Sequence, residues 1–187
     1  MKHSIRVGGN MAGEMVWMDL EMTGLNLERE SIIEIATLIT DGELNIIAHG
    51  PNLAIKVADE LLENMDEWNT SHHTSSGLVE RIRNEGVTLE EATKQTCDFL
   101  RQNIESGTPP LCGNSIHNDR AFLAKEMPEV LELLHYRIVD VSTIKELSNR
   151  WYPNNPRYIK KDAHRALDDI IESIEELRHY RQTLFKD

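Results

Sequence analysis

The chain has 187 residues, a length typical of one globular domain, and 40% of them are hydrophobic while 28% are charged. This composition excludes a disordered chain, and no run approaches the roughly 20 apolar residues that a membrane helix needs. The formal net charge of −12 at pH 7 disfavours a long basic track for nucleic acid. A short anionic substrate held at bound cations remains compatible with this charge.

Residues 1–14 contain no continuous apolar core, so we expect a flexible leader rather than a signal peptide, with Met11 a conceivable alternative start. A single domain over 15–187, resident in the cytoplasm, is then the expectation. Cys97 and Cys112 show neither CxxC nor Cys/His spacing. We therefore expect two buried, reduced thiols.

Three strands are predicted in the first third of the chain. Residues 15–20 form an apolar run broken only by Asp19, and 31–40 are rich in Ile and Thr. A third strand over 44–55 follows the turn at Asp41-Gly42. Strands joined by short connections predict an antiparallel meander.

Helical spacing begins after residue 58. Helices are predicted over 58–65, 76–84, 88–104, 118–127, 142–150 and 163–184, with short strands at 111–113 and 137–141 and a loop over 153–161. Thr88 followed by Glu91 is typical of a capping box. The last helix should cover a sheet face with one stripe, formed by Leu167, Ile170, Ile171, Ile174 and Leu177. This order predicts an α/β fold: a mixed five-stranded sheet, antiparallel and then parallel, with helices on both faces.

Asp19 and Glu21 are two residues apart in the first strand, so their side chains should share one face while Met18 and Leu20 pack on the other. Carboxylates this close repel each other, but a divalent cation between them keeps both ionised. Hard cations such as Mg²⁺ or Mn²⁺ prefer such oxygen ligands. The alternative is simple exposure at a strand end.

Further acids lie near the starts of two predicted helices, those over 118–127 and 163–184. Asp119 lies in GNSIHNDR, where capping of the following helix is the alternative explanation. His164 is a candidate general base because histidine titrates near neutrality, although a surface pair with a neighbouring acid is the alternative. Ideal helix spacing places Asp168 on the face of His164, whereas Asp169 is the better ligand if His164 precedes the helix. Spacing leaves this choice open.

The order D-x-E, then D, then H-x-x-x-x-D stands within long motifs, which are VWMDLEMTGL, IIEIATLITD, MDEWNTSHHTSSGLVERI, LCGNSIHNDRAFL, HYRIVDVSTIKEL and HRALDDIIESIEELRHYR. From Met15 to Phe185 the sequence closely resembles the oligoribonucleases, of the DEDDh branch of exonucleases, which have an RNase H-like fold. The resemblance implies a homodimer that hydrolyses RNAs of two to five nucleotides from the 3′ end. Dinucleotides would be preferred, and 5′-mononucleotides would be the products.

The resemblance also implies which residues carry out the reaction. Asp19, Glu21, Asp119 and Asp169 correspond to the metal-binding acids, and His164 corresponds to the general base. Two Mg²⁺ or Mn²⁺ ions per active site, about 3.5–4 Å apart, would clamp the phosphodiester. The family pattern thus selects Asp169, which helical spacing did not.

Substrate contacts are implied in the same way. Leu25 resembles the family's wedge between the two bases, and Trp68 resembles its stacking platform. Ser115, Arg137 and Ser142 correspond to residues that cap the 5′ phosphate. Arg137 suits this task because a guanidinium pairs with phosphate oxygens in a bidentate manner.

Two further correspondences concern the dimer. Tyr136 and His73 correspond to residues that reach toward the active site of the neighbouring subunit; packing within the subunit is the alternative. His117 departs from the family pattern, since relatives have smaller or amide residues near this position. A titratable ring beside Asp119 could perturb the site.

Three other functions remain in competition. Another DEDDh enzyme, for example a proofreading exonuclease subunit or a ribonuclease T-like trimming enzyme, would prefer longer strands. D-x-E-x-T is similar to the D-x-D-x-T opening of haloacid-dehalogenase-type phosphatases, but Glu21 replaces the acid/base Asp and no convincing Lys/Asp set follows. A non-catalytic oligonucleotide-binding module is the third alternative. The presence of all five expected site residues argues against it.

Overall fold

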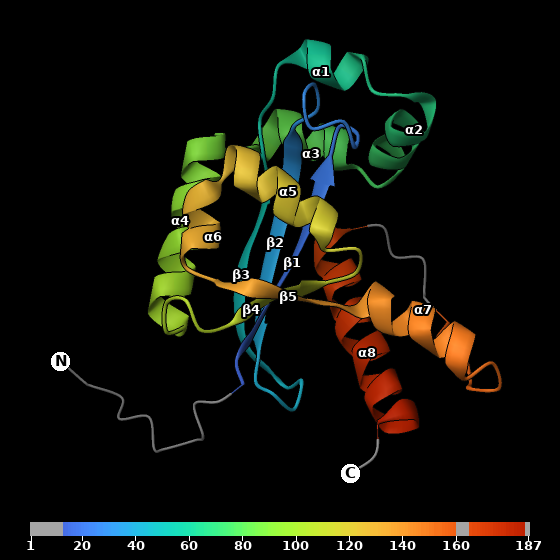
Figure 1. The fold of residues 1–187 in the computed structure, drawn as a ribbon. Coiled ribbons are helices and arrows are strands. Elements are labelled where there is room, and N and C mark those ends of the chain that lie inside the picture. The colour runs from blue at the N-terminus through green and yellow to red at the C-terminus, as the bar shows by residue number, and fades with distance from the viewer. Residues whose placement is uncertain (1–12, 160–164, 186–187) are drawn as a thin grey trace.

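The computed structural model describes residues 13–159 and 165–185. Its five strands form one mixed sheet in the order β3-β2-β1-β4-β5 (Figure 1). β1, β2 and β3 form an antiparallel meander, and β4 and β5 continue the sheet in parallel. The strand bounds are Met15–Met22, Ile32–Thr40, Ile46–Ala54, Pro110–Gly113 and His135–Asp140. The predicted mixed five-stranded sheet is confirmed.

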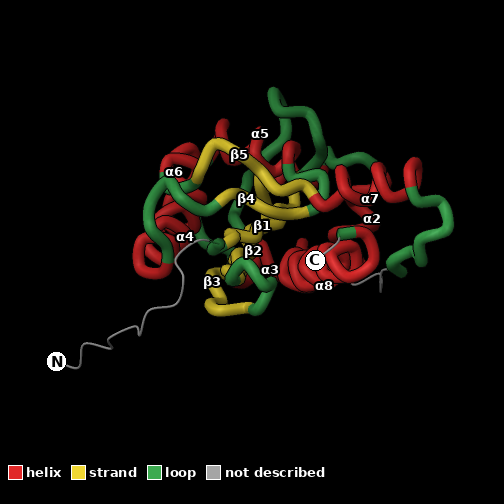
Figure 2. The backbone as a smooth tube through the Cα atoms, turned by 60° about the horizontal axis from the view of Figure 1, so that its bottom comes forward, coloured by secondary structure: helices red, strands yellow, loops and turns green. Residues whose placement is uncertain are grey.

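Helices cover both faces of the sheet, as predicted (Figure 2). On one face lie α4 (Leu89–Asn103), α5 (His117–Glu126) and α6 (Pro128–Glu132), packed against Val16, Met18 and Leu20 of β1. On the other face lie α7 (Val141–Trp151) and α8 (Ala166–Leu184), packed against Trp17. The alternation along β1 therefore separates two apolar layers and aims its odd-numbered residues at α8.

A third group of helices, α1 (Asp59–Glu63), α2 (Glu67–Ser75) and α3 (Leu78–Glu85), lies near the end of β1 (Figure 1). Leu62, Leu78 and Ile82 from this group pack on Ile33 of β2. α2 was not predicted as a helix because it has almost no apolar residues; within it only His73 is buried. Its start is fixed by Asp66, whose carboxylate accepts a 2.8 Å hydrogen bond from the Asn69 N–H.

One half of the predicted capping box of α4 is observed, because Thr88 Oγ1 accepts a hydrogen bond from the Glu91 N–H at 3.2 Å. The Glu91 carboxylate accepts from Gln95 Nε2 at 2.8 Å instead. The predicted apolar stripe of α8 is wrong at Ile171, which is 37% exposed. The buried face continues instead through Ser173, Glu176 and Tyr180. Ser173 and Glu176 have hydrogen-bonding partners, and Tyr180 packs in the apolar layer while its hydroxyl donates to Glu176 at 3.0 Å, so hydrophobic spacing alone did not identify them.

Both cysteines are buried and unbridged, as expected. Within the described parts of the chain, no helix is both long enough and apolar enough to cross a membrane. The leader residues 1–12 lie outside the described residues, as do His164 and the end of the loop predicted over 153–161.

Candidate active site

Asp19 and Glu21 project from β1, the central strand of the sheet, toward the start of α8. Carboxylate oxygens of Asp19, Glu21 and Asp169 all lie within 4.8 Å of one another. The predicted shared face of Asp19 and Glu21 is therefore observed. Glu21 has a side chain that is only 18% exposed, so the alternative of an exposed strand end does not apply.

At the beginning of α8, the two adjacent aspartates point in different directions. Asp169 is half-buried and points at the β1 acids, whereas Asp168 is exposed. The helix begins at Ala166, and its cap residue Arg165 has an extended backbone, so residue 165 is not helical. The structure brings Asp169 into the cluster and leaves Asp168 outside it. His164 lies outside the described residues.

Asp119 lies in the first turn of α5, as predicted, and is 6% exposed. Its Oδ1 accepts a 2.9 Å hydrogen bond from the backbone N–H of Leu20 on β1. This bond holds the carboxylate beside the strand that carries Asp19 and Glu21. Asp119 thus joins the site from the opposite helical layer.

Burial and the charges of neighbouring acids raise the pKa of Asp19, Glu21 and Asp119. Burial, followed by the charges of Asp119 and Glu21, raises the pKa of Asp19 well above its ordinary value. Burial, together with the charges of Glu34 and Asp169, raises the pKa of Glu21 to about 8. Burial raises the pKa of Asp119 to about 7, although the Leu20 N–H opposes this shift. A positive charge placed among these oxygens would remove the repulsion.

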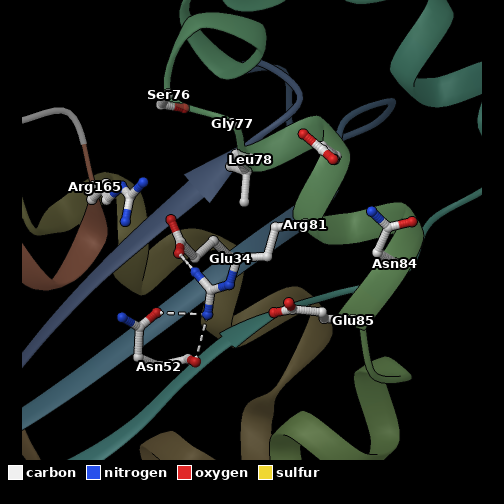
Figure 3. Close-up of a pocket in the computed structure, with 10 residues that line it drawn as sticks. Glu34, Asn52, Ser76, Gly77, Leu78, Arg81, Asn84, Glu85 and Arg165 are labelled. Atoms are coloured by element: carbon white, nitrogen blue, oxygen red, sulfur yellow. Dashed lines mark hydrogen bonds and ion pairs between the residues drawn. The ribbon is translucent and has the colours of Figure 1, made fainter.

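The donor set fits a hard divalent cation, because oxygen atoms of Asp19, Glu21 and Asp169 converge from two elements. Glu34, directly opposite Glu21 in the β1–β2 ladder, is a further buried acid of this region. Arg81 of α3 forms an ion pair with Glu34 and donates to the Asn52 carbonyl oxygen at 2.6 Å (Figure 3). This pairing gives Glu34 a positive partner within the protein, whereas the oxygens of Asp19, Glu21 and Asp169 converge on one another.

A cleft of about 470 Å³ adjoins the acids. It is lined by Glu21 together with Leu25, which is 71% exposed, and Trp68, which is 68% exposed. Large apolar side chains this exposed are available to stack on or separate planar groups. Trp68 also stacks on His72, with ring centroids 4.7 Å apart and an angle of 11° between the planes.

His73 is buried at the back of this region. The ring is 1% exposed; Nε2 lies 3.0 Å from the Met22 carbonyl oxygen and Nδ1 lies 3.9 Å from Glu21 Oε2. Burial lowers the pKa of His73. Within the single chain described, the ring packs inside its own subunit and faces Glu21, which is the packing alternative named for it above.

The predicted phosphate cap lies at the carboxyl end of β4 and β5. Ser115 has a left-handed backbone with φ 50°, held by hydrogen bonds of 3.0 Å from its N–H to Asp140 Oδ1 and to Ser142 Oγ. The Ser142 hydroxyl in turn donates to Asn114 Oδ1 at 3.0 Å. Ser115 and Ser142 are therefore adjacent, as the resemblance implied.

Asn114 links this pair to the acid cluster. Its amide donates to Ser173 Oγ at 2.8 Å, and the Ser173 hydroxyl donates to the Asp169 carbonyl oxygen at 2.8 Å. Arg137 and the 72% exposed Tyr136 lie on the edge strand β5, with the guanidinium 5.5 Å from the centre of the Tyr136 ring. His117 does not face Asp119; its ring lies 3.6 Å from Asp140.

Comparison with known proteins agrees with this geometry. Residues 16–177 match the RNase_T exonuclease family. A probable oligoribonuclease of Dictyostelium discoideum is 57% identical over 172 residues, covering 92% of this chain and 90% of that protein. The mitochondrial oligoribonuclease of Homo sapiens is 52% identical over 185 residues, covering 98% of this chain and 78% of that protein. The chain belongs to the oligoribonuclease family of exonucleases.

Solved structures of exonuclease I share the fold of this exonuclease. The Methylocaldum szegediense protein superposes with a TM-score of 0.71 at 17% identity, covering 91% of this chain and 41% of that chain. E. coli exonuclease I in complex with a dT13 oligonucleotide gives a TM-score of 0.72 at 13% identity, with the same coverage of 91% and 41%. This exonuclease spans about two fifths of those chains, and the likeness identifies the RNase H-like fold.

Sequence reasoning missed three residues that organise the site of this exonuclease. Glu34 and Arg81 form the buried ion pair, and Asn114 connects Ser142 with α8. An acid inside the apolar run SIIEIATLIT was a usable signal for Glu34. Arg81 and Asn114 had no such signal, because their partners lie 47 and 59 residues away along the chain.

Proposed function

We propose that this exonuclease removes nucleotides from the 3′ end of RNAs of two to five nucleotides, prefers dinucleotides, and releases 5′-mononucleotides. The observation that carries the proposal is the convergence of Asp19, Glu21 and Asp169 next to the cleft that contains Leu25 and Trp68. The names of relatives at 52–57% identity support the same activity. A net charge of −12 also favours a compact substrate over a long polyanion.

Asp19, Glu21, Asp119 and Asp169 would hold two Mg²⁺ or Mn²⁺ ions per active site. When bound, such ions supply the charge that activates water and stabilises the leaving oxygen of a phosphodiester. The residues fit this task because their oxygens converge and because burial and repulsion raise the pKa of Asp19 and Glu21. Asp119, fixed by the Leu20 N–H, would complete the set.

His164 would act as the general base and take the proton from the attacking water. Its imidazole suits this role because it exchanges a proton near neutral pH. The proposal follows from the family pattern and from its place two residues before Ala166, where α8 begins.

Substrate length would be measured between two ends of the site. Leu25 would separate the two bases and Trp68 would stack on one of them, which their exposure beside Glu21 supports. Ser115, Ser142 and Arg137 would bind the 5′ phosphate through hydroxyls and a guanidinium. The Asn114–Ser173 bridge would keep this cap at a fixed distance from Asp169. His73 would contact substrate from behind Glu21.

The assembly and location are proposals too. β5 is an edge strand with exposed Tyr136 and Ile138, and such edges pair with other chains, which supports a homodimer in which Tyr136 reaches the neighbouring active site. We assign one exonuclease domain to 15–187 and place it in the cytoplasm.

The test is cleavage of 5′-phosphorylated RNAs of two to seven nucleotides and of about 20 nucleotides, with Mg²⁺, with Mn²⁺ and with a chelator. We expect the dinucleotide to be hydrolysed fastest and the chelator to abolish hydrolysis. Faster cleavage of the long strand would instead indicate a trimming or proofreading exonuclease. Binding without metal-dependent cleavage would indicate a non-catalytic module.

A further inference from the structure

The protonation of the buried ring of His73 is determined by one neighbour. Its Nε2 lies 3.0 Å from the carbonyl oxygen of Met22, and a carbonyl oxygen can only accept. Nε2 therefore carries the ring proton, and the neutral ring presents a lone pair at Nδ1. Among the described residues, this buried Nδ1 has no hydrogen-bond partner.

A carboxylate, which is another acceptor, faces that lone pair. Glu21 Oε2 lies 3.9 Å from His73 Nδ1, beyond hydrogen-bond distance, and once Glu21 is ionised its carboxylate has no proton to donate. Two acceptors that face each other in a buried position are unfavourable unless a cation or a donor lies between them. With Glu21 ionised, the buried Nδ1 and the carboxylate together favour a cation between them.

His72 directs a second nitrogen at the same carboxylate. Its Nε2 lies 4.0 Å from Glu21 Oε1, and its ring is held by stacking on Trp68. The ligand atoms of Glu21, His72 and His73 all lie within 4.8 Å of one another. A tetrahedral ion with bonds of about 2.0–2.1 Å places its ligands somewhat closer than the observed 3.9–4.0 Å. Small side-chain rotations would close this difference.

We propose that Glu21, His72 and His73 form a second metal site, which takes Zn²⁺ or another ion that prefers imidazole nitrogen. The carboxylate cluster offers only oxygen and suits hard cations, whereas this site offers two nitrogens and one carboxylate, a common set for zinc. The two sites share Glu21. An ion at the nitrogen site therefore draws Glu21 toward α2 and away from Asp19 and Asp169.

Sharing a ligand couples the two sites. Zinc at the nitrogen site weakens the binding of Mg²⁺ at the carboxylates, and by linkage Mg²⁺ weakens the binding of zinc to the same extent. The site therefore acts as an inhibitory metal site. Its existence does not depend on the substrate of the exonuclease, so it can be tested without any cleavage assay.

The test uses Co²⁺ as a spectroscopic substitute for Zn²⁺ on the full-length protein. Four-coordinate Co²⁺ with nitrogen ligands absorbs visible light strongly, and six-coordinate Co²⁺ bound by oxygen absorbs weakly. We expect a strong visible band that added Zn²⁺ removes. His72→Phe keeps an aromatic ring stacked on Trp68 but removes the metal ligand. Loss of a residue that only orients a ligand typically lowers metal affinity by roughly 10–100-fold, so Co²⁺ affinity should fall by at least about 10-fold here.

His49→Phe is the matched control, since His49 is exposed on β3 and outside the cluster. It should leave the Co²⁺ band unchanged, and circular dichroism should show both variants folded. The wild-type protein with excess Mg²⁺ should need more Co²⁺ to develop the band. A weak, octahedral-type spectrum in the wild type would overturn the proposal, as would an unchanged band in His72→Phe. If excess Mg²⁺ did not change the Co²⁺ concentration needed for the band, the two metal sites would not share Glu21.

Discussion

The backbone N–H of Leu20 donates a 2.9 Å hydrogen bond to Asp119 Oδ1, across 99 residues of sequence. This bond attaches α5 to the central strand at the position between Asp19 and Glu21. One carboxylate thus has two tasks, which are to satisfy a buried donor and to contribute charge to the site. Substitutions can separate these tasks.

Asp119→Asn keeps an oxygen that accepts from Leu20 but removes the charge, whereas Asp119→Ala removes both. We expect both variants to lose cleavage, but only Asp119→Ala to lose an additional 1–3 kcal/mol or so of unfolding free energy, because it leaves the Leu20 N–H unpaired. Urea denaturation with chelator present measures the difference. Equal stability of the two variants would show that the hydrogen bond contributes nothing.

Asp168 and Asp169 provide a matched pair on one helix. Asp169→Asn should lower the cleavage rate by roughly 100-fold or more. Mutating a residue that only supports a metal ligand typically costs roughly 10–100-fold in activity, and losing the ligand itself should cost more. Asp168→Asn should have little effect, because Asp168 is exposed and outside the cluster. Initial rates on a labelled dinucleotide decide between them. Equal losses would remove Asp169 from the assignment.

The pH dependence of stability follows from the raised pKa values. Glu21 moves from an ordinary pKa of 4.5 to about 8 in the folded chain, and Asp119 from 3.8 to about 7. Between these values the folded chain holds protons that the unfolded chain has released. Without divalent ions, the unfolding free energy should therefore fall as pH rises from about 4.5 to 8.

Differential scanning calorimetry with chelator at pH 6 and pH 8.5 measures this change, since 1 kcal/mol corresponds to about 2–4 °C in a chain of this size. Glu21→Gln cannot titrate at this position, so its Tm should fall less than that of the wild type. Adding Mg²⁺ should restore the wild-type Tm at pH 8.5. If the Tm of Glu21→Gln and that of the wild type fall equally between pH 6 and pH 8.5, the raised pKa of Glu21 is refuted.

Trp68 should contribute to substrate binding rather than to folding, because its ring is largely exposed beside the acids. Trp68→Ala should weaken dinucleotide binding by about 1–3 kcal/mol, the value typical of one stacked base, or roughly 5–150-fold. Trp151→Ala is the control, since Trp151 is 66% exposed at the end of α7 and does not line this cleft. An equal loss in both variants would contradict the stacking role.

Much of this arrangement was predictable because its signals are local. Alternation along β1 predicted the shared face of Asp19 and Glu21, and the strand and helix order predicted the mixed sheet. The choice of Asp169 was not local: it depends on where α8 begins, and ideal helical spacing indicated Asp168. α2 escaped prediction for a related reason, since it is held by the Asp66 cap and by the burial of His73 rather than by an apolar stripe.

The central claim is that Asp19, Glu21, Asp119 and Asp169 hold a pair of divalent ions. Mn²⁺ titration of the full-length protein, followed by electron paramagnetic resonance with a non-hydrolysable dinucleotide bound, tests it most directly. Two Mn²⁺ ions about 3.5–4 Å apart should give a spin-coupled spectrum at two ions per chain, and Asp19→Asn should abolish it. A spectrum of isolated Mn²⁺ at every metal concentration, unchanged in Asp19→Asn, would contradict the account.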